Sequence, residues 1–166
     1  NGFSYDNGKR LLTDDEDTYS YDANGNMTVK TNKTTGEVER YTYDAENRLK
    51  KYEKFVDANS TTAITTALYQ YDGLGRRTLK NVDGKITKYI LDVENVLLEL
   101  NESDQIKTRY THALAMDDII SMDTDTNNDN NLDMVYYYHK DGLGSVTNLT
   151  DSNGAVVQSY IYDGFG

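Results

Sequence analysis

A short motif recurs through the chain: an aromatic residue, any residue, a second aromatic or aliphatic residue, and an aspartate. Residues two apart on a strand point to the same face, so both large side chains of each copy lie on one side of a sheet. The aspartate ends the strand, because its short carboxylate bonds backbone amides in turns. The last two residues of the six copies are Tyr5 and Asp6, Tyr21 and Asp22, Tyr43 and Asp44, Tyr71 and Asp72, Leu91 and Asp92, and Tyr162 and Asp163.

A residue that tolerates a positive φ follows each aspartate, and a second strand begins directly after it. We expect this role for Gly8, Gly25, Asn47, Gly75, Asn95 and Gly166. Each unit is therefore a predicted β-hairpin. One hairpin is marginal in water, so the units should stack edge to edge. The predicted fold is all-β: an array of antiparallel β-hairpins in a twisted or spiralling sheet, shell or tube wall. A short turn of helix is expected only between Ala113 and Met122.

The composition supports β structure and excludes some functions. The chain has 15 Tyr against 3 Phe and no Trp, and Tyr suits half-buried pleated surfaces. The net charge of -11 argues against nucleic-acid partners, which require clustered Lys and Arg. No apolar run approaches the roughly 18 residues of a membrane span. Cysteine is absent, which excludes disulfides and cysteine-based metal sites.

The Tyr-Asp-x-x-Gly pattern resembles the YD repeats of bacterial Rhs and wall-associated proteins, toxin-complex cocoon subunits and animal teneurins. Residues 136–151, YYYHKDGLGSVTNLTD, look like the start of the Rhs repeat-associated core. The resemblance implies three segments: a YD-repeat hairpin array at 1–112, an insertion with an acidic Asp/Asn loop at 113–135, and a truncated core start at 136–166.

The resemblance also implies a function. In such families the repeats wind into a hollow shell around a variable C-terminal toxin or effector. We therefore expect this chain to be an excerpt from a longer bacterial protein, secreted or at the cell surface, and to be a structural wall segment and not an enzyme. The effector, attached or enclosed in the parent chain, would lie outside the excerpt.

The acidic loop is the one segment with a candidate ligand site. Oxygen-bearing side chains alternate at Asp125, Asn127, Asp129, Asn131 and Asp133, as in loops that wind around Ca²⁺. The twelfth position is Tyr136 where such loops have Glu, which predicts weak affinity. The alternative interpretation is a flexible acidic insertion without an ion.

Two other functions stay open at this point. Rows of Tyr could stack on glycans, as in a carbohydrate- or cell-binding adhesin. Open sheet edges could pair with other copies and form a filament. No catalytic residues are predicted: the repeated aspartates occur once per turn, as turn caps do, and catalysis requires an asymmetric pair. The structural repeat residues are Tyr21, Asp22, Gly25, Tyr43, Asp44, Tyr71, Asp72, Gly75, Tyr162 and Asp163.

Overall fold

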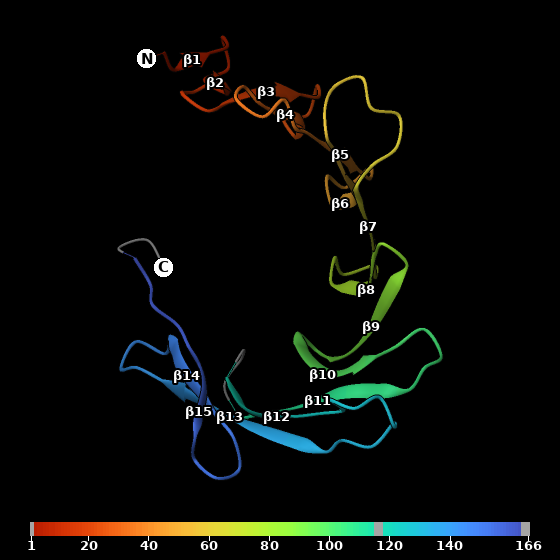
Figure 1. Cartoon of the computed structure of the whole chain (residues 1–166), viewed down its shortest axis with the longest axis vertical. Coiled ribbons are helices and arrows are strands. Elements are labelled where there is room, and N and C mark those ends of the chain that lie inside the picture. The colour runs from red at the N-terminus through yellow and green to blue at the C-terminus, as the bar shows by residue number, and fades with distance from the viewer. Residues whose placement is uncertain (1, 115–117, 164–166) are drawn as a thin grey trace. The chain divides into compact units, whose positions relative to one another are not determined.

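The computed structural model describes residues 2–114 and 118–163 and divides the chain into two compact units, residues 1–86 and 87–166. Every regular element in these residues is a β-strand, and the strands follow one another in the sheet in chain order (Figure 1). Each pairing described within a unit is antiparallel. The predicted all-β array of antiparallel hairpins is therefore confirmed.

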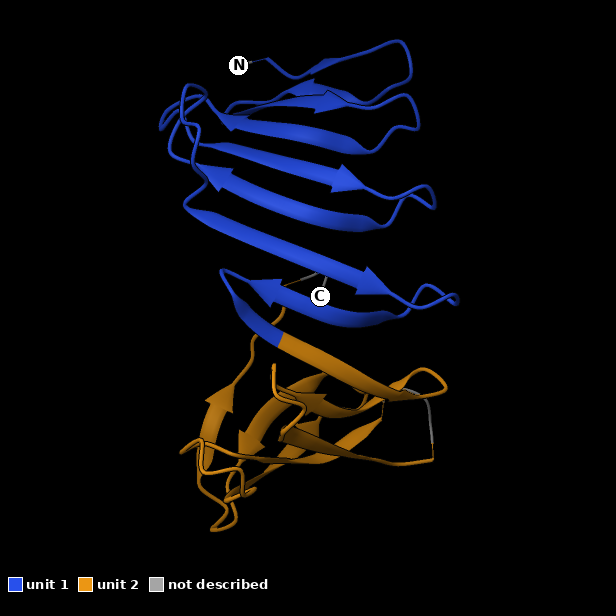
Figure 2. Ribbon diagram, turned by 90° about the vertical axis from the view of Figure 1, so that its right-hand side faces the viewer, with its two compact units in different colours: residues 1–86 blue, residues 87–166 orange. Residues whose placement is uncertain are grey.

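The first unit is a single layer of strands (blue in Figure 2). Its strands are β1 (Ser4–Tyr5), β2 (Leu11–Thr13), β3 (Asp17–Tyr21), β4 (Met27–Asn32), β5 (Val38–Tyr43), β6 (Leu49–Phe55), β7 (Thr65–Tyr71) and β8 (Arg77–Val82). Strand β9 (Lys85–Asp92) begins in the first unit and continues into the second. The second unit continues with β10 (Asn95–Leu100), β11 (Ile106–His112), β12 (Ile119–Thr124), β13 (Met134–Lys140), β14 (Val146–Thr150) and β15 (Val156–Ser159).

The strand registers follow from the alternation of the sequence. In β5, Tyr41 and Tyr43 are half-buried whereas Thr42 between them is exposed. Tyr41 pairs directly with Tyr52 of β6, and their ring centroids lie 5.4 Å apart. Cross-strand aromatic pairs of this kind stabilise a sheet by a few tenths of a kcal/mol to about 1 kcal/mol.

Few side chains of the sheet are fully buried. In the first unit the buried apolar residues are Val38, Phe55 and Ala67. Val38 and Phe55 pair across β5 and β6, and the Arg40 guanidinium lies 4.4 Å from the centre of the Phe55 ring. In the described part of the second unit, Leu149 is the buried apolar residue. With so little apolar burial, much of the stability must come from strand pairing and polar contacts between hairpins.

One local expectation is wrong. The helical turn predicted between Ala113 and Met122 is replaced by strand β12 from Ile119 onward, and residues 115–117 lie outside the described residues. The β-branched Ile119 fits a strand that pairs with both β11 and β13. Within the described part of the chain, no helix is long and apolar enough to cross a membrane. The predicted division at residues 112 and 135 stays a prediction.

Candidate functional site

The repeated aspartate organises each turn through one carboxylate oxygen. In the turn between β5 and β6, Asp44 Oδ1 accepts hydrogen bonds from the amides of Glu46 at 2.9 Å and Arg48 at 3.0 Å. Asp44 Oδ2 accepts a third bond, at 2.7 Å, from Arg48 Nε. The Arg48 amide, with help from its guanidinium, holds the pKa of Asp44 below its usual range. The aspartate therefore stays ionised and fixes the turn.

The same turn recurs in both units. In seven turns of the described residues, one side-chain oxygen accepts bonds from the amides two and four positions later. The accepting residues are Asp6, Asp22, Asp44, Asp72, Asn101, Asp141 and Asp151. The repeated motif predicted the first four as turn caps and did not mark the last three. The letters DGLG at both 72–75 and 141–144 are the signal that could have revealed one of them.

The third position after the capping residue has a positive φ in every one of these turns. It is Gly25, Asn47 and Gly75 as predicted, with φ of 90°, 61° and 83°. Two predicted positions are wrong. After Asp6 the residue is Lys9, because the Gly8 amide is already bonded to the carboxylate. After Asp92 it is Val93, because Asp92 pairs with Asn95 and leaves only a two-residue connection. Gly166 lies outside the described residues.

The tyrosine before the capping residue links its hairpin to the preceding one. Tyr71 donates its hydroxyl hydrogen bond to the Leu49 carbonyl at 2.8 Å. The acceptor begins the second strand of the preceding hairpin, and we call this contact the tyrosine clamp. Four clamps occur in the described residues: Tyr21 to Leu11, Tyr43 to Met27, Tyr71 to Leu49 and Tyr162 to Val146, at 2.7 to 3.0 Å. The clamp requires a hydroxyl group, which explains why the repeat has Tyr and not Phe at this position.

A histidine makes an equivalent contact in the second unit. His112 ends β11, and its Nε2 lies 2.8 Å from the Val96 carbonyl, as a clamp hydroxyl would. The six motif copies predicted from the sequence do not include His112. The signal was the aromatic residue two positions earlier, Tyr110, which gives the segment the same spacing as the tyrosine copies.

The residue four positions after the capping residue connects neighbouring turns. Arg10 donates to the Asp22 carbonyl, and Arg48 donates to the Asp72 carbonyl, each at 3.1 Å. Both guanidinium groups also lie 5.1 Å from the ring of the next clamp tyrosine, a cation–π distance. Asn26 bonds Asn47 of the following turn at 2.8 Å. Successive turns of the first unit are therefore joined side chain to backbone or side chain to side chain.

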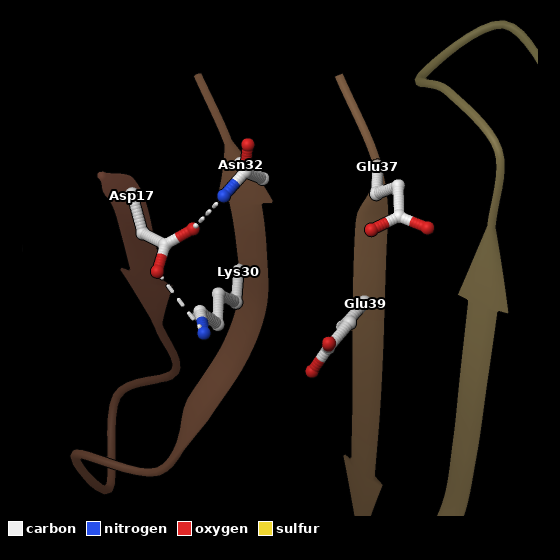
Figure 3. A pocket seen from close by; sticks show the side chains of 5 residues that line it. All are labelled: Asp17, Lys30, Asn32, Glu37 and Glu39. Carbon is white, nitrogen blue, oxygen red and sulfur yellow. Dashed lines mark hydrogen bonds and ion pairs between the residues drawn. The ribbon is translucent and has the colours of Figure 1, made fainter. Parts of the chain in front are cut away.

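A polar cavity of about 130 Å³ lies in the first unit and is lined by Asp17, Lys30, Asn32, Glu37 and Glu39 (Figure 3). Asp17 is buried, and its carboxylate contacts Lys30 at 3.0 Å and Asn32 at 3.2 Å. Both glutamates also have partners: Glu37 pairs with a lysine of β6, and Glu39 accepts a bond from a tyrosine hydroxyl. Each carboxylate of the cavity therefore has a partner within the chain, as in a cross-strand network.

The predicted calcium residues lie in the connection between β12 and β13. Asp125 is buried, whereas the other four are exposed. Asp133 accepts bonds from the amide and hydroxyl of Thr126. Asp129 accepts a bond from the Asn131 amide at 2.8 Å. No group of three or more His, Cys, Asp or Glu side chains is arranged to hold a metal in the described residues, so calcium binding stays a prediction.

Comparisons with known proteins place this geometry in a family. Residues 21–54, which include β4, β5 and all of β6 except Phe55, match the family model RHS Repeat. The chain is 32% identical to the tRNA(Glu)-specific nuclease WapA of Bacillus subtilis subsp. natto and 31% identical to the tRNA3(Ser)-specific nuclease WapA of Bacillus spizizenii. Each match covers 95% of this chain, which spans only 6% of the length of those curated relatives.

A solved structure shares the fold. The crystal structure of TcdB2-TccC3-Cdc42 matches 84% of this chain and 7% of its own chain, with a TM-score of 0.59 and 18% sequence identity. The likeness at this identity concerns the fold alone. Because an RHS repeat lies inside the array of clamped hairpins and the relatives are similar along nearly the whole chain, the predicted resemblance to the RHS-repeat family is confirmed.

Proposed function

We propose that this chain is a structural wall segment of an Rhs-type toxin-delivery or cell-surface protein, secreted or exposed by a bacterium, and that it carries no catalytic activity of its own. The observation that carries the proposal is the tyrosine clamp, which recurs from hairpin to hairpin. A contact that repeats along an array stabilises architecture, whereas a catalytic site requires one asymmetric arrangement.

The names of the relatives describe a nuclease activity. We infer that this activity belongs to other parts of those much longer proteins. The net charge of -11 supports this, because tRNA phosphates are held by clustered Lys and Arg. His139, Asp141 and Ser145 do not form a catalytic group: the His139 ring bonds Thr150, and Asp141 caps its turn. The 166-residue chain incubated with total tRNA should neither cleave nor bind it. Cleavage above a buffer control would refute the proposal.

The wall role has a separate test in a parent protein that carries this segment and a C-terminal effector. Tyr43→Phe and Tyr71→Phe together remove two clamp hydroxyls and keep both rings. We expect faster digestion of the effector by an added protease than in the unmodified parent. Tyr137→Phe is the matched control, because Tyr137 is 43% exposed and does not precede a turn cap. Equal effector protection in the clamp variant and the control would contradict the wall role.

Glycan binding and filament formation stay predictions. Eleven of the fifteen tyrosines are half-buried, which supports packing over sugar stacking as their main use. The four exposed tyrosines are Tyr5, Tyr137, Tyr160 and Tyr162. A glycan array tests the first alternative, and sedimentation velocity across protein concentrations tests the second.

A further inference from the structure

Asp125 holds a buried carboxylate oxygen with no partner. Its side chain is 0% exposed, and Oδ1 has no hydrogen-bond donor among the described residues. The other oxygen, Oδ2, is bonded to Lys107 Nζ at 2.5 Å and to the Asn130 amide at 3.0 Å. A buried carboxylate oxygen without a donor has lost its hydrogen bonds to water and gained none in exchange, which is unfavourable. The orphaned Oδ1 therefore indicates a ligand that would satisfy it.

The exposed loop that follows Asp125 carries further oxygen-bearing side chains. The Asn130 amide bonds Asp125, so the loop folds back over the buried group. Asn128 and Asn130 adopt positive φ values of 63° and 69°, which turn the backbone sharply. Asp129 and Asp133 have no salt bridge to a cation in the part of the chain that the structure describes. The loop that begins at Asp125 thus carries negative charge that no cation of the described residues pairs with.

The side chain of Lys107 already places a positive charge beside the Asp125 carboxylate. The Lys107 ammonium contacts Asp125 Oδ2 and also Asn130 Oδ1 at 3.1 Å. Lys107 shows that the position attracts a cation, but an ammonium leaves Oδ1 unsatisfied. A metal ion can contact several oxygens at once. Six to eight hard oxygen ligands in a flexible loop suit Ca²⁺, whereas Mg²⁺ demands a nearly ideal octahedron.

We propose that the loop at 125–133 binds one Ca²⁺ through Asp125 and through side-chain oxygens of Asn127, Asp129, Asn131 and Asp133, in competition with Lys107. Binding requires the exposed side chains of the loop to turn inward and the Lys107 ammonium to move away. The cost of that rearrangement, together with Tyr136 in place of a bidentate Glu, sets the affinity in the weak range of extracellular modules, a dissociation constant of about 10⁻⁴ to 10⁻³ M.

Calorimetric titration of the 166-residue chain with CaCl₂, with a thermal melt at each metal concentration, tests the proposal. We expect saturable binding of one ion and a melting temperature that rises with calcium. Asp129→Asn removes one exposed carboxylate and should weaken binding about tenfold without unfolding the chain. Lys107→Met removes the competing ammonium and should tighten binding.

The matched control is Asp57→Asn, which alters an exposed aspartate that caps the connection between β6 and β7. Its calcium binding should equal that of the unmodified chain. Terbium luminescence sensitised by Tyr136 adds a second readout, since energy transfer requires the ion to lie near the ring. Absence of heat and of thermal stabilisation at about 10 mM Ca²⁺ would overturn the proposal. So would binding by the Lys107→Met variant alone, or equal weakening by Asp57→Asn and Asp129→Asn.

Discussion

Replacement of Tyr71 by Phe isolates one tyrosine clamp. The change deletes the hydroxyl that donates to the Leu49 carbonyl at 2.8 Å and keeps the ring, so the contact with the Arg48 guanidinium at 5.1 Å survives. A typical intramolecular hydrogen bond contributes about 0.5 to 1.5 kcal/mol to the free energy of unfolding. Tyr71 is half-buried, so water can partly satisfy the freed carbonyl, and we expect a loss of about 1 kcal/mol.

Urea unfolding followed by circular dichroism measures this loss. With a slope of about 2 kcal/mol/M, a loss of about 1 kcal/mol lowers the urea midpoint by about 0.5 M. Tyr5→Phe is the control, because Tyr5 is 56% exposed and no clamp contact is described for it. Its midpoint should change by less than half as much. If Tyr71→Phe costs no more than Tyr5→Phe, the clamp does not couple neighbouring hairpins in the way inferred.

Three further predictions follow from the same contacts. Asp44→Ala removes a turn cap and should lower the urea midpoint by more than Tyr5→Phe does, with faster amide exchange confined to that turn. His112→Phe removes the contact with the Val96 carbonyl and should lower stability by about 1 kcal/mol; an unchanged midpoint would deny His112 a clamp role. The hydrogen bond from Tyr19 to an aspartate raises the pKa of Tyr19 to about 12, and burial raises the pKa of Tyr41. Tyrosines with raised folded pKa values contribute stability that is complete below pH 10 and is lost as the pH rises through the folded values, so an alkaline titration should show unfolding above about pH 10.

Much of the fold could be predicted because the information is local. Alternating aromatic residues before Asp22, Asp44 and Asp72 predict both the strand and its end. The exact turn was harder to predict. The choice of Lys9 over Gly8 for the positive φ depends on which amide the carboxylate already binds, and this is a property of the folded backbone.

The contacts between hairpins could not be predicted for a related reason. The acceptors of the clamp are carbonyl groups such as that of Leu49, and every residue has one, so side-chain identity does not mark them. The contact between Lys107 and Asp125 was missed as well, because 18 residues separate its partners and only the pairing of β11 with β12 brings them together. The alternating oxygens of the acidic loop were visible in the sequence, but the orphaned oxygen of Asp125 was not.

The position of the tyrosine clamps also determines where such chains can accept insertions during evolution. Clamps form at one end of the hairpins, where Asp22, Asp44 and Asp72 cap their turns. The opposite ends carry the connections that differ most in length, including residues 56–64 and 125–133. An insertion at those ends leaves each clamp undisturbed. Mutations that lengthen the chain should therefore accumulate at one margin of the sheet, and foreign peptides for display or delivery should be grafted there.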